Sequence, residues 1–440
     1  MKRIIILCAA IVLICSCTAN RTRTGDTVIT KWQHGKNGAV SLTYDDGSIN
    51  QFRVALPMMN ELGIPATFFI NTGQIAGSAY RGKFIGRPVQ EIIKETASVP
   101  TGPENFYERS SAARFLGYRG TSQYHTDAGA LIDEENPQEA YKVIDQLYEK
   151  VRRGDFQPLG RPRNVSSRDE GITWDDIRTY AARGHEFASH MVTHPRLAAL
   201  DEANILYELE KSREEILAQL GRKHIFSAEV PYGTENERAM EYAYKVYPAL
   251  RNRMPEPFLK ELNRASTENP VSQEKEYVQW QRGATTKTPL PLMKSWIDTT
   301  AARDNIWLVL VFHGVDGIGW EALDSDLLRD YFNYIESHSK YLWTATFGDV
   351  AKYMRERMNA TVITETKKDR IDVNVSHTLD NEDYDLPLTL KTCVTPKWKE
   401  VQVRQGETVM TINPEKDSGK SFVMYQVIPN AGTAELTRIR

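Results

Sequence analysis

The sequence lacks an excess of charge of either sign, because its 440 residues have a formal net charge of −3. This balance gives no support for nucleic-acid binding or for a polybasic membrane-binding surface. After the N-terminal segment it also lacks an apolar run of about 18 or more residues, so we expect no membrane-spanning helix there. With 41% hydrophobic residues, the chain can form one large or roughly two to three ordinary domains.

Cysteine is scarce as well, and three of the four cysteines lie within the first 17 residues. Residues 1–3 are basic at two positions and precede an apolar stretch at 4–14, which is too short to span a bilayer and is typical of a secretory signal peptide. The residues before Cys17 resemble the lipobox of bacterial lipoproteins, which implies that Cys17 is lipidated and begins the mature protein. A plain signal peptide is the alternative. Cys393 would then be the remaining thiol, so no intrachain disulfide could form.

Short apolar strands alternate with amphipathic helices from about residue 32 to residue 358. The helix predicted over 201–220 is an example, because Ile205, Leu209 and Ile216 share one face. Strands separated by helices indicate βαβ units, and therefore an α/β fold with a parallel sheet or barrel. The predicted strands are residues 40–44, 66–70, 186–189, 226–230, 277–280, 307–312 and 342–346.

Three segments depart from this alternation. Residues 18–31 are polar and short of large hydrophobic side chains, which predicts a tether between a membrane anchor and the folded protein. Residues from about 76 to 171 form an insertion in which Pro137–Arg153 has the one clear helical pattern. From 361 to 440 the apolar residues alternate with period two, which predicts a separate all-β sandwich.

Two adjacent carboxylates, Asp45 and Asp46, directly follow the first predicted strand in "TYDDG". Neighbouring negative charges repel each other and are costly to bury. A solvated Asp-Gly turn is the ordinary interpretation. In a parallel α/β fold, however, the chemistry gathers at the carboxyl ends of the strands, where this pair lies.

Two histidines four residues apart, His190 and His194, follow another predicted strand in "EFASHMVTH". That spacing places both imidazoles on one face of a helical turn, within reach of one metal ion. Because the aspartates and the histidines both follow strand ends, we expect them on the same rim of the sheet. Two histidines and one carboxylate form a facial ligand set that leaves positions open for water and substrate.

Four motifs taken together resemble those of the NodB-type polysaccharide deacetylases, carbohydrate esterase family 4. "TYDDG" is similar to the first motif of that family, "SHMVTH" to its second, "VPYG" to the end of its third and "LVFHG" to its last, in family order. The resemblance implies that the α/β part of the chain is a distorted (β/α) barrel. Together with the segments identified above, the expected order is a signal peptide at 1–17, a tether at 18–31, a deacetylase domain at 32–358 with its insertion at about 76–171, and a small all-β accessory domain at 361–440.

The resemblance also implies a ligand set for one divalent metal ion, namely Asp46, His190 and His194. Zinc is the first expectation, and cobalt, nickel or manganese would suit the same ligands, because this set does not select sharply among them. A bound cation would also make the adjacent negative charges of the aspartate pair less costly.

Three further positions take family roles. Asp45 would be the general base that accepts a proton from a metal-bound water, and His313 the general acid that protonates the leaving group. Tyr232 would bind substrate, with its backbone N–H directed at the oxyanion and its ring at the edge of the groove.

The sequence departs from the family pattern at Glu229, where the family commonly has an arginine that pairs with the base. A glutamate there would raise the pKa of Asp45, unless it turns away or another arginine takes the place. Arg251, in strand-like residues 248–253, is our candidate, and we include it among the expected substrate-site residues; a solvated arginine is the alternative. The Asp–Trp motif that supports the histidine acid has no clear counterpart, and its candidates are Trp280, Trp296, Asp298 and Trp320.

The insertion is rich in tyrosine and arginine, which suit stacking on sugars, so we favour a cap over the substrate site rather than a decorative subdomain. His125 lies in this insertion, and we expect it to be an ordinary surface-loop histidine.

Three functions remain open on this basis. The first is metal-dependent removal of N-acetyl groups from amino-sugar chains such as peptidoglycan or chitin-like polymers. The second is removal of O-acetyl groups from a plant or capsular glycan. The third is an inactive glycan-binding lipoprotein, which the presence of all five polar site residues disfavours. The expected partners are an acetylated glycan and, through Cys17, a membrane, with the protein exported to the bacterial cell envelope on the periplasmic or outer side.

Overall fold

The computed structural model describes residues 23–159, 171–255, 258–417 and 419–439. The chain divides into two compact units, a barrel unit and a β-unit. The barrel unit comprises Ile29–Thr361 and Ser376–Thr389, and the β-unit comprises the described residues up to Val28, Val362–Val375 and the residues from Leu390 onwards. The expectations for the signal peptide and for Cys17 lie outside the described residues.

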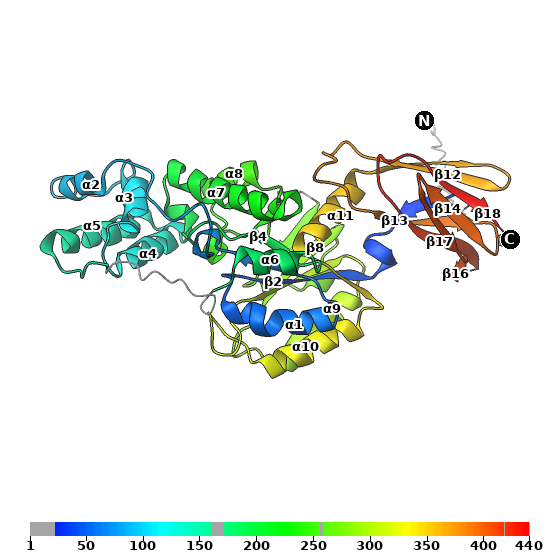
Figure 1. Cartoon of the computed structure of the whole chain (residues 1–440), viewed down its shortest axis with the longest axis horizontal. Coiled ribbons are helices and arrows are strands. Elements are labelled where there is room, and N and C mark those ends of the chain that lie inside the picture. The colour runs from blue at the N-terminus through cyan, green and yellow to red at the C-terminus, as the bar shows by residue number, and fades with distance from the viewer. Residues whose placement is uncertain (1–22, 160–170, 256–257, 418, 440) are drawn as a thin grey trace, which may run out of the picture. The chain divides into compact units, whose positions relative to one another are not determined.

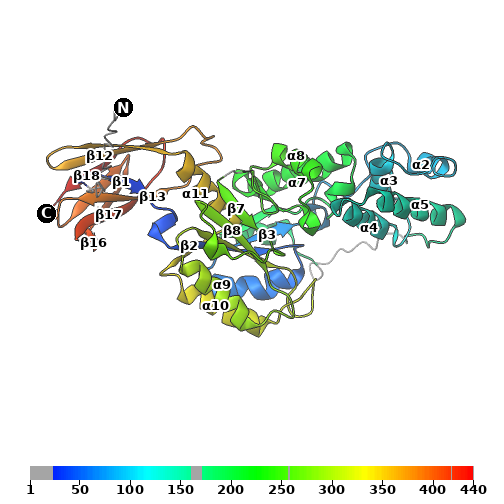
Figure 2. The same ribbon diagram turned by 180° about the vertical axis from the view of Figure 1, so that it is seen from behind.

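One sheet of nine strands, all paired in parallel, forms the centre of the barrel unit (Figures 1 and 2). The strand order is β6-β5-β4-β3-β2-β9-β8-β7, and β10 also pairs with β2. The sheet curls into a half-barrel, which confirms the predicted α/β barrel fold. The strands are β2 (Gly38–Tyr44), β3 (Ala66–Ile70), β4 (Glu186–Ser189), β5 (Ser227–Ala228), β6 (Ala249–Leu250), β7 (Leu259–Leu262), β8 (Tyr277–Gly283), β9 (Ile306–Phe312) and β10 (Leu342–Thr344).

Each of the seven predicted strands has a counterpart in this sheet, and β6 lies within the strand-like residues 248–253. Strand β7 was not predicted. Its apolar residues, Leu259 and Leu262, are three positions apart, a spacing that suits a helix as well as a short strand. Pairing with β8 decides the matter, because it satisfies the backbone groups of β7 at the edge of the sheet.

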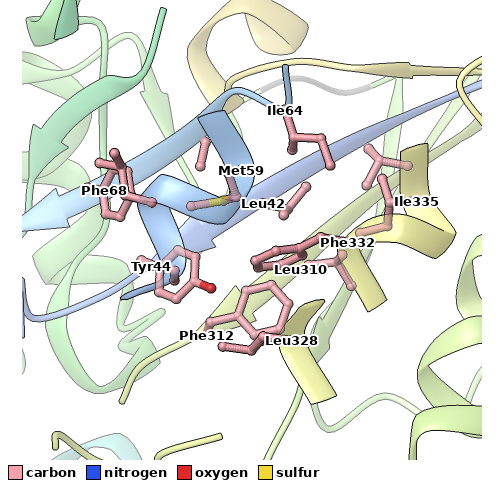
Figure 3. Close-up of a cluster of buried hydrophobic side chains, with 14 of the residues drawn as sticks. Leu42, Tyr44, Met59, Ile64, Phe68, Leu310, Phe312, Leu328, Phe332 and Ile335 are labelled. Carbon is pink, nitrogen blue, oxygen red and sulfur yellow. The ribbon is translucent and has the colours of Figure 1, made fainter. Parts of the chain in front are cut away.

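The main hydrophobic core lies between the sheet and helices α1 (Leu56–Glu61), α9 (Leu290–Ala301) and α10 (Ser325–Ser337). Helix α10 begins at Asp324, whose side chain accepts hydrogen bonds from the first-turn N–H groups, and its apolar residues follow helical spacing. Alternate residues of each strand point to this side. Figure 3 shows the resulting contact between Leu42, Tyr44, Phe68, Leu310 and Phe312 of the sheet and Met59, Leu328, Phe332 and Ile335 of the helices.

The opposite face of the sheet is more polar. Thr43 donates a hydrogen bond to the Leu310 carbonyl (2.8 Å), and the Trp307 indole donates to the Ser41 hydroxyl (3.0 Å). Helix α11 (Phe347–Asn359) packs there through Phe347, whose ring contacts Trp307. The remaining helices of the barrel itself are α6 (Trp174–Ala181), α7 (Glu202–Leu220) and α8 (Glu237–Val246). Asp201 caps α7, in agreement with the predicted helix.

The insertion contains four helices with a hydrophobic core of their own (Figure 1). The predicted helix Pro137–Arg153 is α5, and it is joined by α2 (Val89–Glu95), α3 (Phe106–Ala113) and α4 (Thr121–Asp133). These three were not predicted, because they are short or mix buried polar residues with small ones. Residues 160–170, near the end of the insertion, lie outside the described residues.

The β-unit contains two sheets, with strand orders β1-β13-β17-β16 and β11-β12-β18-β14-β15 and antiparallel pairing such as that of β14 with β18. Two boundaries differ from the expectation. Strand β1 (Thr27–Ile29) lies within the expected tether and joins this unit, whereas Ser376–Thr389 joins the barrel unit. The other strands are β11 (Thr361–Thr366), β12 (Arg370–Ser376), β13 (Leu388–Val394), β14 (Val401–Gln405), β15 (Thr408–Ile412), β16 (Glu415–Asp417), β17 (Lys420–Val427) and β18 (Ala434–Arg438).

Within the described ranges, no helix combines the length and the apolar character needed to cross a bilayer. Cys393 is a free thiol, half-buried beside strand β1 of the same unit.

Candidate active site

The polar residues singled out in the sequence meet at the carboxyl ends of neighbouring strands. Asp45 and Asp46 follow β2, His190 follows β4 and His313 follows β9. Parallel strands bring all these ends to one edge of the sheet. They line a cavity of about 400 Å³, together with His194, Tyr232 and Trp320.

Asp46, His190 and His194 form a cluster whose candidate ligand atoms all lie within 4.8 Å of one another. The Asp46 Oδ1 atom is 3.2 Å from His194 Nε2 and 3.6 Å from His190 Nε2. His190 Nδ1 donates a hydrogen bond to the carbonyl of Glu229 (2.8 Å), which leaves its Nε2 free to coordinate. Burial lowers the pKa of His190 to about 4, so this imidazole is neutral at neutral pH. The donor set therefore fits one divalent cation.

The backbone at this cluster is strained. Asp46 (φ 74°), His194 (φ 57°) and Tyr232 (φ 66°) all have left-handed conformations that non-glycine residues rarely adopt. Such conformations cost about 1–3 kcal/mol each and persist where the surrounding structure imposes them. Their presence in three separate loops at one cavity marks this edge of the sheet as the functional one.

Asp45 is buried beside Arg251 in a bidentate ion pair. Arg251 Nη1 donates to Asp45 Oδ1 (2.8 Å) and Nη2 to Oδ2 (2.6 Å). The same guanidinium donates through Nε to Glu229 Oε2 (3.1 Å), and Nη2 lies 2.8 Å from Glu229 Oε1. One arginine thus contacts two carboxylates at once. Arg251 pairs with Asp45 in the way expected of the motif arginine, whose position in this sequence is occupied by Glu229.

The raised pKa that was expected for Asp45 is found at Glu229 instead. Burial by itself would raise the pKa of Asp45, but the charge of Arg251, the neighbouring histidines and the hydrogen bonds outweigh it and hold that pKa well below its usual range. Burial raises the pKa of Glu229 to about 7 against the opposing charge of Arg251, and the charge of Asp45 raises it further. Glu229 therefore does not raise the pKa of Asp45 above its usual range, because Arg251 takes the place of the motif arginine, which is the alternative that the sequence left open.

Arg251 does not line the cavity, in contrast to the expectation that it belongs to the substrate site. Its side chain is only 1% exposed, and it contacts Thr43 and the ring of Phe69 in addition to the two acids. We therefore assign it to positioning Asp45.

His313 lines the same cavity, and its Nε2 atom lies 3.4 Å from Asp45 Oδ2. Burial lowers its pKa, although Asp45 and Asp46 oppose the effect. Among the candidates for the Asp–Trp motif, Trp320 is the one that contacts His313, with its ring edge-on at a centroid distance of 4.6 Å. Trp280 and Trp296 lie in the hydrophobic core, and Asp298 binds Tyr334.

Tyr232 is 42% exposed at the mouth of the cavity. Its ring lies 4.7 Å from that of His194, and the guanidinium of Arg196 covers it at 4.5 Å. Arg196 and Arg264 also line the cavity, but the sequence analysis did not identify either of them as a site residue. A signal was available for each, because Arg196 follows the second histidine by two residues and Arg264 follows β7 by two.

The insertion reaches the site through Arg196. Asp133 of α4 binds its guanidinium at 2.5 Å, and His125 of α4 accepts a hydrogen bond from its backbone N–H (3.2 Å). His125 is 1% exposed and also bonds Ser110, so the expectation of a surface-loop histidine is wrong. The expected cap is not tested by these contacts, but they fix one wall residue of the cavity.

Residues 33–100 and 129–247 match the sequence model described as polysaccharide deacetylase. A gellan lyase from a Bacillus species is 24% identical over 275 residues, which cover 59% of this chain, and this chain spans only 11% of that protein. A family 4 carbohydrate esterase from Bacillus anthracis has 14% identity and a TM-score of 0.34, covering 75% of this chain and 86% of its own. The chitin deacetylase from the fungal pathogen Colletotrichum lindemuthianum also has 14% identity and a TM-score of 0.34, and the match covers 72% of this chain and 88% of that protein.

Proposed function

We propose, on the match of residues 33–100 and 129–247 to the polysaccharide deacetylase sequence model, that the protein hydrolyses acetyl groups from a glycan with one divalent cation, zinc being the first expectation. The observation that supports metal dependence is the convergence of Asp46, His190 and His194 beside Asp45 and His313 in one cavity.

Asp46, His190 and His194 would hold the cation, which, when bound, lowers the pKa of a coordinated water and polarises an acyl carbonyl. Asp45 accepts the proton of the attacking water. It is suited to this because Arg251 keeps it ionised and fixes the orientation of both its oxygens.

His313 protonates the departing nitrogen or oxygen, and its Nε2 atom lies close to the same Asp45 oxygen. Base and acid therefore flank one reaction centre. The backbone N–H of Tyr232 stabilises the developing oxyanion, and the exposed rings of Tyr232 and Trp320 form the rim on which sugar rings stack.

We propose N-deacetylation as the reaction, with ester cleavage as the alternative that the same groups permit. The test uses the purified full chain with an N-acetylated chitin oligosaccharide and an O-acetylated xylan oligosaccharide, measuring released acetate and new free amine. Acetate with an equal amount of amine is the expected result. Acetate from the xylan alone identifies an esterase, and no acetate from either, or from the acidic probes described below, in the presence of added zinc, cobalt or manganese contradicts the proposal.

A chelator control tests the cation. Dialysis against a chelator should abolish acetate release, and re-addition of a stoichiometric amount of metal should restore it. Full activity after complete metal removal, checked by elemental analysis, contradicts metal dependence.

We also propose that Cys17 attaches the protein to a membrane by a lipid. Replacing Cys17 by Ser should move the protein from the membrane fraction to the soluble fraction in a bacterial host. Cys15→Ser is the matched control, because it changes the neighbouring cysteine and should leave the fractionation unchanged.

A further inference from the structure

The cavity contains a positive charge that forms no ion pair with any described carboxylate. Arg264 follows β7 and lines the cavity together with His313 and Glu229. Among the described residues, no carboxylate or hydrogen-bond acceptor pairs with its half-buried guanidinium.

The position of this side chain depends on two glycines. A Cβ atom on Gly233 would lie 3.0 Å from Arg264 Nη2, and one on Gly283 would lie 3.1 Å from Arg264 Cδ. A Cβ atom at either position would force the arginine side chain to shift by a few tenths of an ångström, so the two glycines leave room for it in the cavity lining.

The other arginines of the site are already neutralised. Arg251 binds Asp45 and Glu229, and Arg196 binds Asp133. Glu229, which also lines the cavity, accepts a hydrogen bond from Asn252 (3.3 Å) in addition to its contacts with Arg251, so both of its oxygens are occupied. Arg264 is therefore a cavity cation that forms no close ion pair within the described part of the chain, and the charges of Glu229 and Glu235 act on it only from a greater distance.

A partly desolvated guanidinium is most stable when an anion pairs with it. Its planar fork of N–H donors matches the two oxygens of a carboxylate and forms short, charge-assisted hydrogen bonds. The hydroxyl groups of a neutral sugar would accept hydrogen bonds from the guanidinium but would not neutralise its positive charge.

We infer that Arg264 binds a carboxylate on a sugar close to the acetylated residue, so that the substrate is an acidic glycan containing uronic acid. This inference rests on the proposed deacetylase function. It accounts for a second positive group beside the proposed metal site, because a carboxylate of the substrate would neutralise the charge of Arg264.

The test compares an acid with its own neutral derivative. The probes are a hyaluronan oligosaccharide, which alternates N-acetylated and uronic acid sugars, and the same oligosaccharide with its carboxylates converted to methyl esters. An O-acetylated oligogalacturonide and its methyl ester form a second pair, in case the acetyl group is an ester. The readout is the ratio of kcat/KM for acid to methyl ester, measured by acetate release.

The full-length protein should prefer the acid, and Arg264→Gln should reduce the ratio about 10-fold or more, the usual effect of one charged hydrogen bond. Arg303→Gln is the matched control, because it removes the same charge from an exposed residue beyond α9 that does not line the cavity. An unchanged ratio in Arg264→Gln overturns the inference.

Binding separates this inference from the proposed activity. Calorimetry with the same acid and ester should show tighter binding of the acid to the full-length protein and loss of that difference in Arg264→Gln, whether or not acetate is released. Acetate release with no acid preference contradicts the inference alone. Acid preference in binding without acetate release from any probe contradicts the proposed activity alone.

Discussion

A single guanidinium determines the protonation states of the two buried acids next to the candidate metal ligands Asp46, His190 and His194. Arg251 forms a fork with Asp45 and a second pair of contacts with Glu229, and all three side chains are at most 4% exposed. Because burial penalises each charge, the positive charge can fully compensate only one carboxylate. The pKa of Asp45 falls and that of Glu229 rises to about 7. The network therefore keeps the proposed base ionised.

Replacing Arg251 by Lys should change the pH dependence of activity. Lysine keeps a positive charge but cannot form the bidentate contact, so the pKa of Asp45 should rise. A base must be ionised to work, so the acid limb of the kcat/KM profile should move to higher pH. Arg253→Lys, at an exposed arginine paired with Glu237, is the control and should leave the limb in place. An unshifted limb in Arg251→Lys would argue against a positioning role.

The two adjacent aspartates should respond differently to the same chemical change. Asp46→Asn removes a charged ligand, so bound metal should fall and activity should fall with it. Asp45→Asn should leave the metal bound and lower kcat about 100- to 10,000-fold, the usual effect of losing a general base. Metal content by elemental analysis and acetate release at saturating metal distinguish the two. Loss of metal in Asp45→Asn with retention in Asp46→Asn would reverse the assignment.

At the scale of secondary structure, the first turn of helix α11 is hydrogen-bonded to Glu186, a buried acid of strand β4. Glu186 of β4 accepts hydrogen bonds from the Gly348 N–H (2.9 Å), Ser227 and Thr67, and it is 2% exposed. A carboxylate at a helix N-terminus also interacts favourably with the helix dipole. Burial raises the pKa of Glu186, and the hydrogen bonds oppose that rise. This contact connects the helix to the centre of the sheet.

Gly348 is required for this close approach, because an added Cβ would lie 2.5 Å from Glu186 Oε1. Gly348→Ala should therefore lower the free energy of unfolding by about 1–3 kcal/mol, as overpacking of a core typically does. Gly171→Ala is the matched control, since its Cβ would meet nothing within 4 Å, and it should be neutral or slightly stabilising. Urea unfolding of both variants measures the difference, and equal stability would refute the contact.

Element prediction depended on how locally each signal is encoded. Helix α7 was predicted because its apolar stripe and its cap at Asp201 lie within one continuous segment. Helices α3 and α4 were missed because their inward-facing residues include polar ones such as His125 and Arg109, which only their neighbours in the insertion can satisfy.

At the scale of the whole molecule, two buried histidines connect stability to pH. His185 Nδ1 accepts a hydrogen bond from the Ala66 N–H (3.1 Å), and His224 Nδ1 accepts one from the Phe187 N–H (3.1 Å). Both bonds require the neutral imidazole. Burial lowers the pKa of each to about 4, below its ordinary value of 6.5.

The unfolded chain therefore binds more protons than the folded protein between about pH 6.5 and pH 4, and stability should fall as pH decreases through that window. His185→Asn keeps an acceptor for Ala66 and removes the titrating group. It should reduce the loss of unfolding free energy between pH 7 and pH 5 by about 2 kcal/mol. Chemical unfolding at the two pH values measures this, and an undiminished pH dependence would contradict the assignment. His224→Asn should behave similarly.

The sequence by itself determined the alternation of strands and helices, and the positions of Asp45, Asp46, His190, His194 and His313 at strand ends. These signals are local, because a strand end and the residues after it are adjacent in the chain. Only the tertiary structure decided that Arg251 pairs with Asp45, that Arg264 lies in the cavity without an acidic partner among the described residues, and that α4 holds Arg196. Each of these depends on distances between segments that lie far apart in the chain. Ion pairing depends on which charges are close in space, and the spacing of residues along the sequence does not specify that.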